Sequence, residues 1–226
     1  MKILRPIAIF LFTTASWAQI ARGPASITAV GTASVSASPD LARVDIGVVT
    51  QAANAQDATV QNATQASTVI TALQGLLGSN ASIKTVSYSV SPVYNNPPAG
   101  QNASIVAYMV TNIVEVTLTD LTQTGKVIDT AIQSGANRVQ GISFDLQDRN
   151  PLIAQALKAA AASARVQADA IASGLSVHTG AILHASESVN SPGPIVGGIA
   201  AAPTTPIQTG LIVVQASVTV EVAITP

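Results

Sequence analysis

The chain has 226 residues, a formal net charge of −1, no cysteine, and 9% charged against 48% hydrophobic residues. A chain of this length buries enough surface to fold by packing alone, so it needs no disulfide framework. The slightly acidic balance excludes nucleic-acid binding, which requires clustered lysine and arginine to neutralise phosphates.

The first 18 residues predict a secretory signal peptide. Lys2 and Arg5 precede a short apolar stretch, which ends in the small-x-small sequence Ser16-Trp17-Ala18. We expect cleavage after Ala18, because the apolar stretch is too short to span a bilayer; an uncleaved anchor is the alternative. Removal of this segment leaves eight basic against eleven acidic residues.

Two strands open the mature chain. Residues 27–37 place small or apolar residues at odd positions, and residues 41–50 place apolar residues at even positions, Ala42, Val44 and Ile46 among them. Each pattern predicts a strand with one buried face. Because Pro39-Asp40 between them suits a turn, we expect the two strands to pair as a hairpin.

A helix and a third strand follow. Residues 55–77 carry an apolar stripe at helical spacing, and Gly78 begins the sequence that ends the helix. Residues 83–94 alternate valine or tyrosine with serine, which predicts a strand. We expect Val86, Tyr88 and Val90 to point inward.

The centre of the chain predicts strand, helix and strand. Residues 108–119 alternate, Asp120 is an N-cap for a helix over 121–134, and Gly135 suits the left-handed turn after it. Strand 138–147 then buries its apolar residues, which are Ile142, Phe144 and Leu146.

A long alanine-rich helix begins at Asn150-Pro151, where an N-cap precedes the residue that lacks an N–H, and it ends at Gly174. Its predicted buried side is Ile153, Leu157, Ala160, Ala164, Ala168 and Ile171. A strand over 175–187, a loop over 190–206 and a strand over 207–224 complete the chain.

One-sided strands with intervening helices predict an α+β fold of two layers, in which three helices pack on one face of a mainly antiparallel sheet. We expect a single domain over residues 19–226. Long strands at a sheet edge pair readily with another chain, and few charges here would prevent it. The sequence therefore predicts a homo-oligomer formed through a strand edge or a polar sheet face.

Histidines offer a weak metal hypothesis. His178 and His184 share one strand face with Glu187 nearby, but six strand residues separate the imidazoles by about 20 Å. One ion cannot bridge both. Ligation by one histidine with distant carboxylates stays open, although a solvated histidine is the better interpretation. We expect no metal and no cofactor.

Asp145 and Asp148, followed by Arg149, form an acid pair in sequence at a helix entrance. Capping and local ion pairing explain carboxylates there, because the helix macrodipole attracts them. No nucleophile elbow, phosphate-binding glycine loop or zinc-protease motif occurs. We therefore predict no catalytic residue and no enzyme, although catalytic partners scattered along the chain stay an alternative.

Two apolar features could be contacts. Tyr88 and Tyr94 are interpreted as core or rim residues rather than a binding box. Ile195, Val196 and Ile199 lie among prolines and glycines, which indicates either a disordered tip or an apolar contact in an oligomer.

Several segments taken together resemble the SIMPL-domain family over about residues 27–224. They are Ile-Thr-Ala-Val-Gly (27–31), Ser-Pro-Asp (38–40), Val-Ser-Tyr (86–88), Pro-Val-Tyr (92–94), Gly-Lys-Val-Ile-Asp (125–129), Gly-Ala-Asn (135–137), Gly-Ile-Ser-Phe (141–144) and the alanine-rich helix. Their order and spacing both match the family.

The resemblance implies an α+β envelope protein, periplasmic or associated with the outer membrane, that tends to oligomerise and has no agreed activity. It implies no catalytic residue. We expect an exported, non-catalytic oligomer with a structural or stress-protective role. The alternative is a periplasmic binding module for a peptide or a small apolar ligand.

Overall fold

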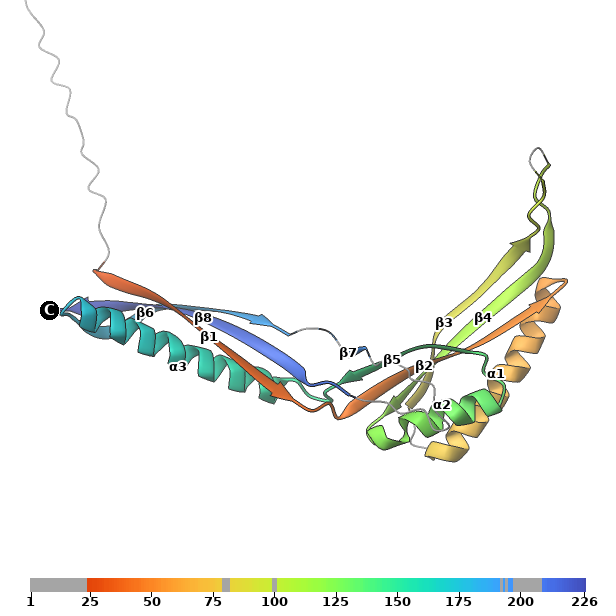
Figure 1. The fold of residues 1–226 in the computed structure, drawn as a ribbon, viewed down its shortest axis with the longest axis horizontal. Coiled ribbons are helices and arrows are strands. Elements are labelled where there is room, and N and C mark those ends of the chain that lie inside the picture. Colours follow the sequence, from red (N-terminus) through yellow and green to blue (C-terminus); the bar gives the residue numbers. More distant parts are fainter. Residues whose placement is uncertain (1–23, 79–81, 99–100, 192, 194, 197–208) are drawn as a thin grey trace, which may run out of the picture.

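The computed structural model describes residues 24–78, 82–98, 101–191, 193, 195–196 and 209–226. Their strands form two separate antiparallel sheets, and each sheet carries helices on one face. The sheets lie at opposite ends of an elongated, bent molecule (Figure 1). The predicted α+β class with antiparallel strands is confirmed, and the strands are divided between two sheets.

The five-stranded sheet has the order β3-β4-β2-β5-β7. Its strands are β3 (Ser82–Tyr94), β4 (Ile105–Leu118), β2 (Leu41–Ala52), β5 (Arg138–Asp145) and β7 (Ile195–Val196). Helices α1 (Ala55–Leu77) and α2 (Thr124–Gln133) cover one face, and a 3-10 turn, η1 (Leu121–Gln123), precedes α2. Between sheet and helices lies a core that includes Val44, Ile46, Leu73, Val116 and Phe144.

Local signals set the boundaries of these helices, and those at Asp120 and Gly135 are the ones that the sequence predicts. Asn54 caps α1 by accepting a hydrogen bond from the Asp57 N–H, and Asp120 accepts one from the Thr122 N–H at the start of η1. Gly135 has φ 111°, which suits the glycine predicted after α2. The predicted helix 121–134 therefore exists, with its first turn in 3-10 form.

The three-stranded sheet has the order β1-β8-β6. It consists of β1 (Ser26–Ala37), β8 (Ile212–Thr225) and β6 (His178–Asn190), and α3 (Asn150–Gly174) packs on one face. Strand β1 pairs with β8 without a register shift, from Ser26 opposite Ala223 to Ala37 opposite Ile212. A second core, separate from the first, lies between this sheet and α3.

Alanine makes the contact between α3 and its sheet. The buried residues recur every four positions: Leu152, Ala156, Ala160, Ala164, Ala168 and Ala172. The predicted stripe was therefore wrong at Ile171, which is 42% exposed. The helix lies so close to β1 that a Cβ on Gly31 would overlap the backbone of Ala160 and Ala164. Small side chains allow this approach, whereas isoleucine would hold the helix away.

The predicted hairpin between the first two strands was wrong. Strand β1 pairs with β8, while β2 pairs with β4 and β5, so the turn at Pro39-Asp40 carries the chain from one sheet into the other. Asp40 is held at this crossing, because its N–H donates to the Asp145 carbonyl and its carboxylate accepts from the Gln147 N–H. The chain therefore continues forward where a hairpin would reverse it (Figure 1).

The inward orientation predicted for the third strand was also wrong. Val86, Tyr88 and Val90 are 47%, 50% and 41% exposed. Strand β3 is the edge of its sheet, and Ser87 and Val90 pair with Ile113 and Val110 of β4, which in turn pair with β2. Only beyond Tyr108 do β3 and β4 extend past β2 (Figure 1). An alternating pattern identifies two faces of a strand, but these side chains lie on the edge strand, outside the core between the sheet and its helices.

The signal segment and the cleavage point after Ala18 lie outside the described residues, and so does Ile199. The single domain over residues 19–226 stays a prediction. What the structure adds is that this stretch contains two hydrophobic cores, one beneath each helical layer.

Candidate functional site

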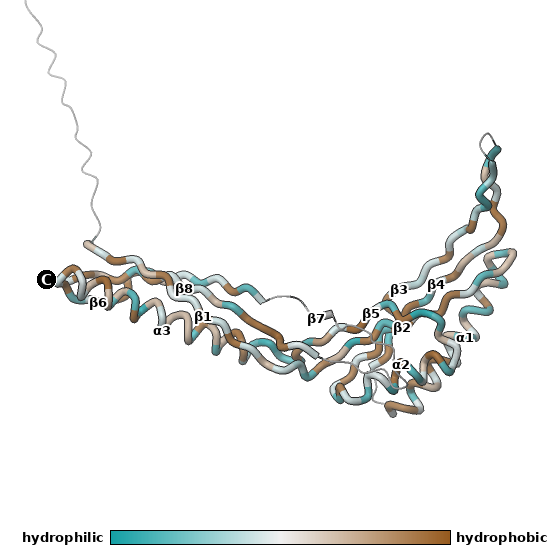
Figure 2. Tube along the Cα trace, viewed as in Figure 1, coloured by the Kyte–Doolittle hydropathy of each residue, from teal (hydrophilic) through white to brown (hydrophobic). Residues whose placement is uncertain are grey.

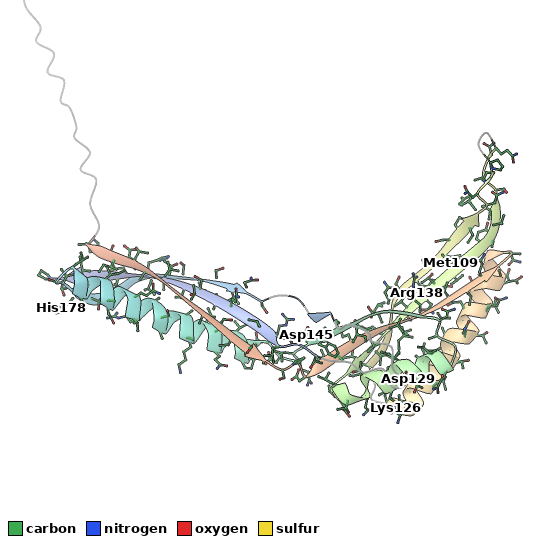
Figure 3. All side chains as sticks on the ribbon, viewed as in Figure 1. Met109, Lys126, Asp129, Arg138, Asp145 and His178 are labelled. Carbon is green, nitrogen blue, oxygen red and sulfur yellow. The ribbon has the colours of Figure 1, made fainter. Side chains whose placement is uncertain are left out.

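Asp145 is the centre of a charged cluster between the two sheets (Figure 3). Its Oδ1 lies 2.6 Å from Arg149 Nη2 and accepts from Arg149 Nε at 2.7 Å, while Oδ2 accepts from Arg43 Nη1 at 3.2 Å. Arg149 also donates through Nη1 to Ser191 Oγ at 2.9 Å. The cluster therefore joins β2, the end of β5, the start of α3 and the residue after β6.

The pKa of Asp145 is lowered. Burial alone would raise it, but the hydrogen bond from the Leu146 N–H and those from Arg149 and Arg43 favour the carboxylate and outweigh burial. Asp148, its neighbour in the predicted acid pair, accepts from the Asn150 N–H at the helix entrance. These contacts support the interpretation as capping and ion pairing, and they tie the two sheets together.

A second group of charges lies on the face of the five-stranded sheet opposite the helices. Asp45 on β2 stands directly opposite Glu115 on β4, and Lys84 on β3 stands on the other side of Glu115, with its Nζ 2.9 Å from Oε1. The Arg138 side chain lies against Gly47 on the same face. Burial, and then the charge of Glu115, raise the pKa of Asp45.

Asp45→Asn is expected to stabilise the protein at neutral pH by less than about 1 kcal/mol, because it removes a repulsion between carboxylates on adjacent strands. Since the pKa of Asp45 is raised in the folded state, its ionisation opposes folding above that pKa. The advantage of the variant should therefore fade as the pH falls through the raised pKa and below 3.8. Urea unfolding of both proteins at several pH values measures this difference.

Lys84→Met serves as the control, because it leaves both carboxylates in place and removes the cation beside them. It should destabilise the protein at neutral pH. A gain in stability for Lys84→Met, or none for Asp45→Asn, would contradict the repulsion.

One buried amide joins α1 to the sheet. Asn62 is fully buried, and its Nδ2 donates to the carbonyls of Val48 at 2.9 Å and Val110 at 3.4 Å. Its Oδ1 and the Oδ1 of Asn112 find no partner among the described residues. The amide orients α1 across β2 and β4.

The histidines lie on the three-stranded sheet. His184 is opposite Glu221 and His178 is opposite Thr225, so both are on the face away from α3, and both are exposed. His178 lies at the far end of the molecule (Figure 3). Within the described residues no three of His, Asp and Glu come together as metal ligands.

A polar hollow of about 520 Å³ lies beside His178. Arg165 and Asp169 form an ion pair at 3.1 Å on its wall, and Thr179 donates to Asp169 at 2.6 Å and accepts from Arg165 at 2.9 Å. The three side chains satisfy one another's hydrogen-bonding groups, and the hollow is open to solvent. The arrangement fastens the end of α3 to β6.

The two apolar features predicted as possible contacts differ in their surroundings. Tyr88 and Tyr94 are 50% and 57% exposed, so neither is a core residue, and of the predicted core or rim positions only the rim fits them. Ile195–Val196 forms β7, which pairs with Ser143 and Phe144 of β5. A contact between these residues and another copy stays a prediction, as does the part of Ile199.

The partners of the charged groups were not predicted from the sequence. Arg43, Asp45 and Lys84 were not singled out, since each is an ordinary polar residue on the exposed face of a strand. A strand register that placed 45 opposite 115 and 43 near 145 would have found both clusters. Alternation in the sequence shows which residues of a strand share a face, but it does not show which residue of a neighbouring strand stands opposite.

The side chains of the described residues identify no reaction, whereas the comparison with known families identifies the family. SIMPL, described as a protein of unknown function (DUF541), matches residues 27–222. The chain belongs to the SIMPL family. The matched region includes both sheets and all three helices, so the two-sheet arrangement is the fold of this SIMPL chain as a whole.

Known relatives agree with the family. The SIMPL chain is 30% identical over 182 residues to the 26 kDa periplasmic immunogenic protein of Brucella melitensis, covering 78% of this chain and 72% of that protein. It is 28% identical over 176 residues to the uncharacterized protein YggE of Escherichia coli, covering 77% and 70%. Among the described residues of the SIMPL chain, no helix is long and apolar enough to cross a membrane.

Proposed function

We propose that this SIMPL protein is an exported envelope protein that works as a homo-oligomeric scaffold, with a structural or stress-protective role and no catalysed reaction. Its first 18 residues have the pattern of a secretory signal. The name of the Brucella relative describes that protein as periplasmic. On these two grounds we propose that this chain is exported to the periplasm, where it is free or in contact with the outer membrane.

The observation that carries the proposal is the extent of open strand edge. Within the described residues, β1, β3 and β6 each pair with a single neighbouring strand. These edges are 12, 13 and 13 residues long. Unpaired N–H and C=O groups along an edge bind a further strand readily. A surface with few charges also repels a copy of itself weakly.

Native mass spectrometry and light scattering of the mature chain test this proposal. We expect a defined multiple of the monomer mass that persists on dilution to micromolar concentration. A particle that stays monomeric across the concentration range contradicts the proposal.

One observation favours a binding module as the second candidate. A hollow of about 520 Å³ lies on the face of the three-stranded sheet away from α3, lined by Thr32, Ser34, Ser188, Asn190, Gln215 and Ser217. Ala33 and Ala216 complete the lining, and this uncharged, partly apolar surface suits a peptide or a small apolar ligand. A monomer that retains a co-purified peptide in the same mass spectrum would favour this candidate over the scaffold.

A further inference from the structure

The end of the molecule formed by β3 and β4 carries an unusual surface, here called the arm: residues 86–94 and 105–109. Of sixteen large hydrophobic side chains exposed among the described residues, seven belong to the arm, so it is the main apolar surface. They are Val86, Tyr88, Val90, Tyr94, Ile105, Val106 and Met109. Met109 marks the arm in Figure 3, and Figure 2 shows hydrophobic stretches along β4 there.

The arm is also uncharged. No Asp, Glu, Lys, Arg or His occurs between Lys84 and Glu115, and these two residues pair with each other at its base. An anionic membrane surface is recognised by lysine and arginine, which the arm lacks. A second copy of the arm is equally neutral, so nothing opposes its approach. Apolar area and missing charge together favour a protein partner of the same composition.

The outer edge of β3 limits where a second strand can pair. A register shift between Thr85 and Ser87 bends the strand at one end, and Pro92 lacks an N–H at the other. Between them residues 87–91 form a regular edge with the sequence Ser-Tyr-Ser-Val-Ser. The centre of this stretch is Ser89.

The other two long edges are less suitable. Strand β6, like β3, has two register shifts, and the regular stretch that follows them, residues 184–190, carries Glu187. Strand β1 is regular, but Val30 is its single large hydrophobic side chain that is exposed. Bulges and charges are features that keep edges from pairing, and β1 has little apolar surface to bury.

We infer that β3 pairs antiparallel with β3 of a second copy about a two-fold axis at Ser89. This inference rests on the proposed oligomer and names its interface. Such an axis is perpendicular to the sheet, so opposite residues share a face. Tyr88 then lies beside Val90 of the second copy, and the paired stretch 87–91 holds no charged residue, so no like charges meet. The two five-stranded sheets become continuous, with α1 and α2 of both copies on one side.

Single cysteines locate the interface, because the natural chain has none. Ser89→Cys on β3, Ser34→Cys on β1 and Ser186→Cys on β6 replace three exposed serines, each on a different edge strand. With a short bis-maleimide, Ser89→Cys should give a covalent dimer in high yield, and the other two should give little. Dimers from Ser34→Cys or Ser186→Cys with none from Ser89→Cys would overturn the inference.

Charge pairs test the register. Ser89→Lys and Ser89→Glu each place like charges opposite each other at the axis, so each variant should assemble about fivefold more weakly. An equimolar mixture should regain assembly, because lysine then faces glutamate. Ser186→Lys on β6 is the matched control and should assemble like the natural chain. Circular dichroism and the melting temperature show whether each variant remains folded.

The outcomes separate the two proposals. A natural chain that is monomeric overturns the scaffold itself. If the natural chain assembles and both Ser89 variants and their mixture assemble as strongly as it does, the scaffold stands and the β3 interface is overturned. Weaker assembly in both variants without recovery in the mixture rejects the two-fold register at Ser89.

Discussion

Gly31→Ala is expected to destabilise the three-stranded sheet by about 3 kcal/mol or more, because overpacking at a close backbone contact forces the elements apart. The added methyl group would overlap the backbone of α3 at Ala160 and Ala164. Neither neighbour can swing aside as a flexible side chain would. Urea unfolding gives the size of the loss.

The loss should also be local. Since the two sheets have separate cores, hydrogen exchange should accelerate in β1, β8 and α3, while β2, β4 and β5 keep their protection. Gly141→Ala on β5 is the control, because a Cβ there meets no atom within 4 Å. An equal loss in both variants would show that glycine flexibility, and not the contact with α3, sets the effect.

Asp145→Asn is expected to cost about 2 kcal/mol, between the value for an exposed pair and that for a fully buried one. The variant keeps the size of the side chain and an acceptor for the Leu146 N–H, and it removes the charge that Arg43 and Arg149 share. Asp169→Asn is the matched control. It breaks another i,i+4 pair, with Arg165, but at an exposed position, and should cost less than about 0.5 kcal/mol.

The pH dependence has a definite sign. The pKa of Asp145 is lower in the folded state, so its contribution is present above the unfolded value near 3.8 and is lost as the pH falls through the folded pKa. The natural chain and Asp145→Asn should therefore approach equal stability in acid. A difference that is constant with pH would mean that the charge of Asp145 is not what holds the cluster.

Secondary structure was accessible from the sequence because its signals are local. The stripe over residues 55–77 gave α1 with the bounds the structure has, and Asn150-Pro151 marked the start of α3. Gly135 was identified as the turn after α2 and has the positive φ that explains glycine there. Asp148 was assigned to the helix entrance, where it accepts from the Asn150 N–H.

Strand partners were not accessible, because alternation gives two faces and no neighbour. Nothing near Pro39-Asp40 says that β1 will pair with a strand almost two hundred residues away. Val86, Tyr88 and Val90 alternate just as a buried strand does, and their exposure follows from the edge position of β3, which alternation does not show. The ion pair between Arg43 and Asp145 could not be predicted without the register between β2 and β5.

The buried side of α3 shows a subtler limit. The predicted stripe correctly contained Ala160, Ala164 and Ala168, but it ended on Ile171, which is exposed. The structure matches Ala160 and Ala164 with Gly31 on the strand beneath them. The small residues of α3 and β1 allow the close approach of the two elements. Their meaning could not be recognised from the sequence, because the sequence does not show that α3 packs on β1.

The pairing of β1 with β8 has a consequence for how the chain is made. Ser26 donates to Glu221 across 195 residues, so the first strand completes its sheet only when nearly the whole chain has been synthesised. The five-stranded sheet, drawn almost entirely from residues 41–145, can fold earlier as a nascent unit. Until β8 emerges, β1 waits as an uncharged, aggregation-prone segment, and a chaperone that shields it would raise the yield of folded protein.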